Sequence, residues 1–198
     1  MIKVGLDLAF RTCGIAILGE DKLSYDSKII RQKSLSEIEI SWQMTEWIFE
    51  QLKPYLEEPF ELVLEDIFKG RNFDVSKNTA RTQGAVVDRY IQLKGIHPKY
   101  VDVITARTKV GVPVQAPKVA IQLWAMDTFK LGQIDSKFRE HIEKTIEQRY
   151  QILDSKEKRH VAERRELKVD LNEYSKRVAT MTGVDEHSAD AIVLTLGS

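Results

Sequence analysis

The chain has 198 residues and a single cysteine, Cys13. One thiol excludes an internal disulfide and a cysteine-based zinc site. The sequence also lacks any run approaching the roughly 18 apolar residues of a membrane-spanning helix. Its first ten residues, MIKVGLDLAF, carry Lys3 and Asp7 where a signal peptide would be apolar. We therefore expect a soluble, cytoplasmic protein with no membrane partner.

The chain also has no net charge, because 30 Lys and Arg residues balance 30 Asp and Glu residues. The charges are nevertheless segregated. Residues 20–68 hold twelve acids against five Lys or Arg, whereas residues 69–118 hold ten Lys or Arg against three acids. Such segregation indicates one basic surface for a polyanion and an acidic remainder. The alternative, that two charge-rich faces merely fall in different halves of the chain, stays open.

The hydrophobic pattern predicts three short strands followed by alternating helices and strands. We expect strands at 2–8, 15–18, 22–30, 60–65 and 100–105, and helices at 34–56, 76–93 and from Pro117 to Phe129. This order indicates an α/β fold with a mixed five-stranded sheet and helices on both faces. We expect the first strand at the centre, next to the fourth.

The helices at 34–56 and 76–93 show further local features. Ser36 is a candidate N-cap for the helix at 34–56. The helical spacing then predicts one apolar face in this helix, formed by Leu35, Ile38, Trp42, Trp47, Ile48 and Leu52. In the helix at 76–93, Ala80, Gly84 and Ala85 are small enough to favour close packing.

Residues 133–180 differ from the rest of the chain. They contain no proline, and their apolar residues recur at helical spacing among dense mixed charge. We interpret them as a helical insertion within a single domain spanning 1–198, with two long helices that break near 154–155. Gly183 ends the insertion, and a last helix at about 184–196 closes the chain.

Four residues are candidates for chemistry. Asp7 is an acid inside an apolar strand, and Glu65 stands at the end of another. His187 and Asp190 are three residues apart, so they share one face of a helix. Taken singly, each fits the polar edge of an ordinary element. Neighbouring first and fourth strands would gather the acids, and clustered carboxylates suit Mg²⁺ or Mn²⁺.

Four segments share a recognisable pattern, namely Gly5-Leu6-Asp7 through Gly14, Leu64 to Phe68 with Arg71-Asn72, Ala106 to Val110 with Pro117-Lys118, and His187 to Ala191. Together they resemble the motifs of the RuvC-type Holliday junction resolvases of the RNase H-like superfamily. Two features depart from the family pattern. Leu8-Ala9 replaces the usual Pro-Gly, and the insertion at 133–180 has no counterpart in the typical bacterial enzyme. The resemblance therefore points to a divergent branch, such as phage-encoded resolvases.

The resemblance implies roles for individual residues. Asp7, Glu65, His187 and Asp190 would be the catalytic, metal-binding set, holding two Mg²⁺ ions with Mn²⁺ as a substitute. Phe68 would stack on an unpaired base, although a core Phe at a strand end is the plain alternative. The residues implied to contact DNA phosphates, each of which is also explained as a solvated charge, are Arg71, Lys77, Arg81, Arg107, Lys109 and Lys118.

The expected function is a Mg²⁺-dependent endonuclease that resolves four-way DNA junctions. Two symmetric cuts need two active sites, which a homodimer supplies. A related RNase H-like nuclease acting on other branched DNA or RNA-containing duplexes is one alternative, and a non-catalytic DNA-binding module is another. An actin-like phosphotransferase would need a second nucleotide-binding half, for which the chain is too short.

Overall fold

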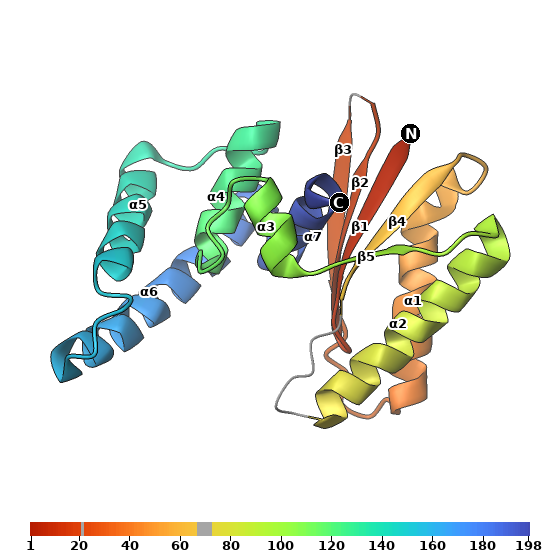
Figure 1. Cartoon of the computed structure of the whole chain (residues 1–198), viewed down its shortest axis with the longest axis horizontal. Coiled ribbons are helices and arrows are strands. Elements are labelled where there is room, and N and C mark those ends of the chain that lie inside the picture. Colours follow the sequence, from red (N-terminus) through yellow and green to blue (C-terminus); the bar gives the residue numbers. More distant parts are fainter. Residues whose placement is uncertain (21, 67–72) are drawn as a thin grey trace. The chain divides into compact units, whose positions relative to one another are not determined.

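The framework of the protein is a five-stranded sheet (Figure 1). The computed structural model describes residues 1–20, 22–66 and 73–198. In these residues the strand order is β3-β2-β1-β4-β5, so the predicted central position of the first strand, beside the fourth, is confirmed. The strands are β1 (Ile2–Leu8), β2 (Thr12–Leu18), β3 (Leu23–Ile29), β4 (Phe60–Glu65) and β5 (Lys99–Val101).

The register of β1 decides what each sheet face carries. β1 runs antiparallel to β2 and parallel to β4, with Leu6 beside Leu64. Val4 and Leu6 are fully buried in the core formed with the helices on one face. Because side chains alternate along a strand, Gly5 and Asp7 belong to the opposite face. The same alternation in β4 assigns Leu62 and Leu64 to the core and Glu65 to the face of Asp7.

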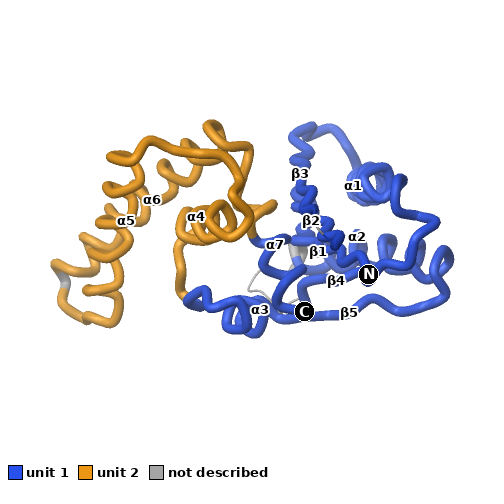
Figure 2. Tube along the Cα trace, turned by 90° about the horizontal axis from the view of Figure 1, so that it is seen from above, with its two compact units in different colours: residues 1–114, 190–198 blue, residues 115–189 orange. Residues whose placement is uncertain are grey.

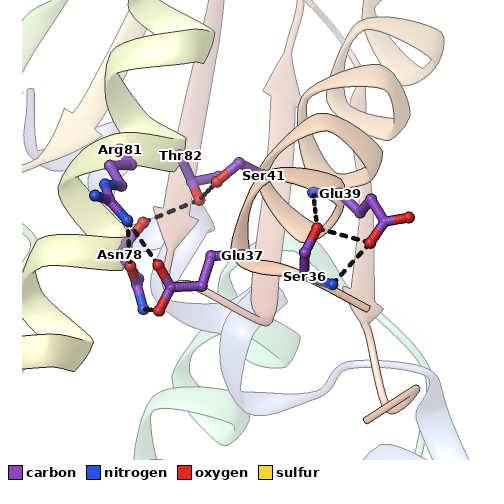
Figure 3. A network of polar contacts seen from close by, with 7 residues as sticks. All are labelled: Ser36, Glu37, Glu39, Ser41, Asn78, Arg81 and Thr82. Carbon is purple, nitrogen blue, oxygen red and sulfur yellow. Dashed lines mark hydrogen bonds and ion pairs between the residues drawn. The ribbon is translucent and has the colours of Figure 1, made fainter. Parts of the chain in front are cut away.

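Helices α1 (Glu37–Leu52) and α2 (Phe73–Lys94) pack on the core face. Ser36 caps α1 as predicted, and its hydroxyl and backbone N–H both bond Glu39 in a capping box (Figure 3). The two helices are also joined by polar contacts. Glu37 accepts hydrogen bonds from Asn78 and Arg81, at 2.8 and 2.6 Å.

The predicted apolar face of α1 is wrong in its first half. Ile38 is 80% exposed and Trp42 is 62% exposed, whereas Ile48 and Leu52 are buried as predicted. The core instead takes a stripe of residues that begins with Ile40 and Met44. The close packing predicted for small residues of α2 is also wrong, because Ala80, Gly84 and Ala85 are exposed.

Helix α7 (Glu186–Gly197) packs on the other face of β1 at a very short distance. A Cβ atom added to Gly5 would lie 2.3 Å from the Thr195 hydroxyl oxygen and 2.4 Å from the Ala191 carbonyl oxygen. Real Cβ contacts do not reach such distances, so only glycine allows this approach. Gly5 thereby sets how closely the residues of α7 approach the strand that carries Asp7.

The fifth strand is shorter than predicted. β5 ends at Val101, and residues 103–105, predicted as strand, begin helix α3 (Val103–Lys109). The physical cause is Asp102, whose carboxylate accepts a hydrogen bond from the Thr105 backbone N–H at 2.8 Å and caps the helix. The apolar run at 100–105 did not reveal this cap.

The chain divides into two compact units (Figure 2). The first comprises Met1–Val114 and Asp190–Ser198, and the second comprises Gln115–Ala189. The second unit contains α4 (Lys118–Phe129), α5 (Ser136–Gln151) and α6 (Lys158–Thr182). The predicted break in the insertion is confirmed, because α5 ends at Gln151 and α6 begins at Lys158. Arg164 of α6 donates hydrogen bonds to the Ile152, Leu153 and Ser155 carbonyl oxygens of this connection.

The insertion packs with α4, which the sequence analysis assigned to the sheet domain. Gln122 of α4 is fully buried, and its amide donates hydrogen bonds to the Ser175 and Val184 carbonyl oxygens at 3.2 and 2.8 Å. The predicted C-terminal stop is confirmed at Gly183, which has a φ of 76°. Within the described ranges, no helix has both the length and the apolar character needed to cross a membrane.

Replacing Gly5 with alanine should destabilise the protein. The added Cβ would overlap the α7 backbone, and overpacking of this kind costs about 1–3 kcal/mol or more. Gly84→Ala is the matched control, because a Cβ at this exposed helical position meets nothing within 4 Å. We expect it to be neutral or to stabilise by up to about 1 kcal/mol. Urea denaturation of both variants measures the difference, and equal stabilities would contradict the tight approach of α7.

Candidate active site

The site begins with two carboxylates at one edge of the sheet. Asp7 is next to the last residue of β1, and Glu65 is the last residue of β4. Because the two strands are adjacent and parallel, their carboxyl ends meet at the same edge. Both side chains are half-buried, on the face opposite the α1–α2 core. The predicted meeting of the two acids is therefore a direct consequence of sheet topology.

The two acids interact strongly. Burial raises the pKa of Glu65 most, followed by the negative charges of Asp7 and Asp190, and the pKa reaches about 7. A side-chain hydrogen bond with Asp7 also raises it, whereas the positive charge of Arg107 lowers it. The Cys13 thiol beside this edge is buried, and its pKa is raised first by that burial and then by Asp7. The pair thus lies in an environment with an excess of negative charge.

Asp190 reaches the site from helix α7, and an arginine engages it. The Arg107 guanidinium donates through Nη2 to the Asp190 Oδ1 at 3.0 Å and through Nη1 to the Val114 carbonyl oxygen at 3.0 Å. The two charged side chains are only 14% and 21% exposed. The sequence predicts a phosphate contact for Arg107, and the structure places its side chain beside the acids of the site. That ion pair joins residues 83 positions apart, so no local pattern announces it.

Packing of α3 against the end of α7 positions Arg107. A Cβ atom added to Gly197 would lie 2.6 Å from the Ala106 Cα and carbonyl oxygen. Ala106 itself is fully buried. The residue that follows it is therefore held beside helix α7, which explains why Arg107 meets Asp190.

Gln83 is a further residue of the site that the sequence analysis did not identify. It lies in α2, is 6% exposed, and donates through Nε2 to the Glu65 backbone carbonyl at 2.9 Å. The next backbone N–H, of Asp66, donates to the Val101 carbonyl at 3.0 Å. These two bonds hold the end of β4 in place. A buried glutamine on a helix has no sequence pattern that distinguishes this role.

His187 belongs to the second compact unit and lies in the first turn of α7. Its ring lies 3.6 Å from the Glu186 carboxylate of the same turn. Asp185 caps the helix through a 2.7 Å hydrogen bond that its Oδ1 accepts from the Ser188 backbone N–H. Glu186 also forms an ion pair with Lys118. The acids that flank the His-x-x-Asp segment therefore have structural partners of their own.

The carboxylates of Asp7, Glu65 and Asp190 in the first unit are chemically suited to bind a divalent cation. In the described part of the chain, no three or more His, Cys, Asp and Glu side chains form a group that could hold a metal ion. However, Glu65 and Asp7 are hydrogen-bonded carboxylates, and the raised pKa shows that a second negative charge there is unfavourable. A hard cation relieves such repulsion, and carboxylate oxygens are its preferred ligands. Asp190 adds a third carboxylate whose charge acts on Glu65.

The other residues predicted to bind DNA have different surroundings. Lys77 on α2 and Lys109 at the end of α3 are exposed. Arg81, also on α2, forms its ion pair with Glu37 (Figure 3). Lys118 belongs to the second unit. Phe68 and Arg71 lie outside the described residues.

Two solved structures of RuvC from Thermus thermophilus are similar to this chain over its full length. One, in complex with a Holliday junction substrate, has 12% identity and a TM-score of 0.60, with 91% of that chain covered. The other has 13% identity and a TM-score of 0.57, with 92% covered. The chain has the RuvC fold. This confirms the predicted RNase H-like class, a mixed five-stranded sheet with flanking helices.

Other comparisons add little to the structural likeness. The ethanolamine utilization protein EutJ from Carboxydothermus hydrogenoformans reaches a TM-score of only 0.39 at 14% identity. No protein-family model matches the sequence, and no curated protein matches it either. The fold is thus shared with RuvC at a sequence identity that conveys the fold alone.

The raised pKa of Glu65 predicts a pH-dependent stability for the metal-free protein. In the unfolded chain Glu65 ionises near its ordinary value of 4.5, whereas in the folded chain it keeps its proton until about pH 7. The unfolded state therefore binds fewer protons in this window, and stability falls as pH rises through it. Glu65→Gln removes this effect. The free energy of unfolding of the variant, relative to that of wild type, should therefore rise by about 2–3 kcal/mol between pH 4.5 and 8.

Chemical denaturation in the presence of a chelator measures this difference. Glu57→Gln is the control, because it removes one carboxylate at an exposed position. A gap between wild type and Glu65→Gln that stays constant from pH 4.5 to 8 would contradict the buried acidic pair.

Proposed function

We propose that the protein is a structure-selective endodeoxyribonuclease that resolves four-way DNA junctions by paired, metal-dependent hydrolysis of phosphodiesters. The observation that carries this proposal is the pair of coupled carboxylates, Asp7 and Glu65, at the carboxyl ends of adjacent parallel strands in a RuvC fold. A solved structure with that fold is a complex with a Holliday junction substrate, which supports branched DNA as the partner.

Four residues would hold the metal ions. Asp7 and Glu65 offer adjacent carboxylates, and Asp190 contributes a third from α7. His187 precedes Asp190 by three residues in the same helix, a spacing that puts both on one helix face. We propose two Mg²⁺ ions, with Mn²⁺ as a substitute. When bound, such a pair activates a water molecule and stabilises the leaving oxygen of a phosphodiester.

The chain's own residues prepare this chemistry. Hydrogen bonds from Gln83 and Asp66 fix the end of β4, so the Glu65 carboxylate is held beside Asp7 before any ligand binds. Partial burial excludes part of the solvent and strengthens charge interactions at the site. Positioning of this kind is valuable for phosphodiester hydrolysis, because misplaced reacting groups lose much of the rate.

We propose DNA contacts for basic residues in each unit, on α2 and α3 in the first and on α4 in the second. Lys77 and Lys109 are exposed and can approach a phosphate directly. Arg81 and Lys118 would exchange their ion pairs with Glu37 and Glu186 for contacts with phosphate. For Phe68 and Arg71, stacking and phosphate contact stay predictions from the resemblance to RuvC-type resolvases.

Resolution of a junction requires two symmetric cuts, so we propose a homodimer that carries one site in each subunit. Branched DNA of this kind arises in bacterial cytoplasm and in phage-infected cells, and the cytoplasmic location and the phage branch stay predictions. A related nuclease that acts on flaps, forks or RNA-containing duplexes, and a non-catalytic DNA-binding module, are outcomes that the experiment below distinguishes.

Neutralising a single acid should abolish cleavage and leave DNA binding intact. Asp7→Asn, Glu65→Gln and Asp190→Asn each remove a charge that faces the metal ions, and we expect rates at least a hundredfold below wild type. Binding should persist or strengthen, because repulsion with phosphate falls. Labelled four-way, three-way, linear and RNA-containing duplexes are incubated with and without Mg²⁺. A denaturing gel then measures cleavage, and a native gel measures binding.

The two gels together separate the proposal from its alternatives. Preference for three-way or RNA-containing substrates would favour the related nuclease, and binding without Mg²⁺-dependent nicking would favour the non-catalytic module. Near wild-type cleavage by any of the three variants would overturn the assignment at that position.

The exposed lysines should set the salt dependence of binding. Each Lys that neutralises a phosphate contributes about 0.9 to the slope of log affinity against log salt concentration. Lys77→Gln with Lys109→Gln should therefore lower the slope for a four-way junction by about two. Lys156→Gln, at an exposed position in the insertion, is the control. An unchanged slope in the double variant, measured by fluorescence anisotropy, would show that DNA binds elsewhere.

A further inference from the structure

The contacts of Arg107 differ from those expected of a residue that binds a DNA phosphate. A phosphate contact requires a guanidinium that reaches the surface, yet the Arg107 side chain is only 14% exposed. Two of its nitrogens are already committed, Nη2 to Asp190 and Nη1 to the Val114 carbonyl oxygen, each at 3.0 Å. Its position is also set by packing, because the preceding residue, Ala106, lies against the end of α7. Arg107 is therefore built into the acidic site.

We propose that Arg107 is the resident counter-ion of Asp190 in the metal-free protein, and that a divalent cation must displace this guanidinium to gain Asp190 as a full ligand. This inference rests on the proposed metal-dependent function and adds a regulating residue to it. Arg107 acts through Asp190, so it is a positioning residue.

Charge and burial support this role. Asp190 is 21% exposed and carries a negative charge beside Glu65 and Asp7, so an unpaired carboxylate there would be unfavourable. The guanidinium supplies the compensating charge and holds the carboxylate at one oxygen, Oδ1. A divalent cation at Asp190 would compete for the same negative charge and would be repelled by the guanidinium. The two cations therefore oppose each other.

The hydrogen bonding of Arg107 is incomplete. Its buried Nε has no hydrogen-bond partner among the described residues. A buried donor without a partner is unfavourable, so this arrangement does not satisfy the guanidinium fully. That shortfall favours a contact that can be exchanged over one that is permanent. It is consistent with an arginine that leaves Asp190 when a stronger cation arrives.

The proposal predicts an increase in metal affinity when Arg107 loses its charge. Arg107→Gln should bind Mn²⁺ about tenfold more tightly than wild type, which corresponds to about 1.4 kcal/mol. A merely structural arginine would give the opposite result, because its removal would disorder Asp190 and weaken binding. Arg107→Lys keeps the charge and should stay within about twofold of wild type.

Isothermal titration of the DNA-free full chain with Mn²⁺ measures these affinities. Lys99→Gln is the matched control, because it removes one positive charge at an exposed position of the same compact unit. We expect it to bind Mn²⁺ as wild type does. Unchanged or weaker Mn²⁺ binding by a folded Arg107→Gln variant would overturn the proposal.

A measurement on the wild-type chain tests the same idea without a variant that could fail to fold. Titration with Mg²⁺, followed by NMR of arginine side-chain nitrogens, should show the Arg107 signals moving toward those of a solvent-exposed guanidinium. Half of the change should occur at the Mg²⁺ concentration that half-saturates the site. Arg107 signals that do not change while Mg²⁺ binds would overturn the proposal.

Asp7→Asn distinguishes failure of this inference from failure of the proposed function. If Asp7→Asn loses Mn²⁺ binding while Arg107→Gln equals wild type, the metal site stands and the counter-ion role falls. If wild type binds no Mn²⁺, or if Asp7→Asn binds it as wild type does, the proposed metal site falls and the counter-ion role falls with it.

Discussion

The parallel pairing of β1 with β4 is the interaction on which the candidate site depends, because it brings the carboxyl ends of both strands to one edge of the sheet. Asp7 and Glu65 stand at those ends and on the same face, and burial together with the nearby charges of Asp7 and Asp190 raises the pKa of Glu65 to about 7. Ionising both carboxylates in this position is unfavourable for the folded protein. The core on the opposite face, formed with α1 and α2, supplies the stability that tolerates it.

Helix α7 connects this sheet edge to the rest of the site. Gly5 allows the helix backbone to approach β1 closely, and Gly197 allows α3 to approach the end of the helix. These two glycines matter because they lack a Cβ atom, not because of their backbone angles. Asp190 immediately precedes Ala191, the first α7 residue that Gly5 approaches, and Arg107 reaches it from α3. The site therefore combines two strand ends with two helices, and each approach distance is set by the absence of a side chain.

The insertion forms a compact unit together with α4. The sequence places α4 with the sheet and predicts 133–180 to be a helical insertion within a single domain. In the structure α4 belongs to the second compact unit with α5 and α6, and the buried amide of Gln122 bonds the Ser175 and Val184 carbonyls there. Buried polar groups need partners, so this glutamine ties α4 to the insertion. The second unit thus has a polar and apolar interior of its own.

The sequence by itself determined approximately where the five strands lie and that Ser36 caps α1, because apolar alternation and capping residues are local signals. It also predicted the first strand beside the fourth, which brings Asp7 and Glu65 to one edge of the sheet. It misjudged Ile38 and Trp42 on α1, since helical spacing identifies apolar residues but not which of them face the sheet. It also missed the Asp102 cap and the amide of Gln83. Only the tertiary structure decided that Arg107 pairs with Asp190. That contact joins distant parts of the chain, and it exists because α3 packs against α7, which no short stretch of sequence specifies.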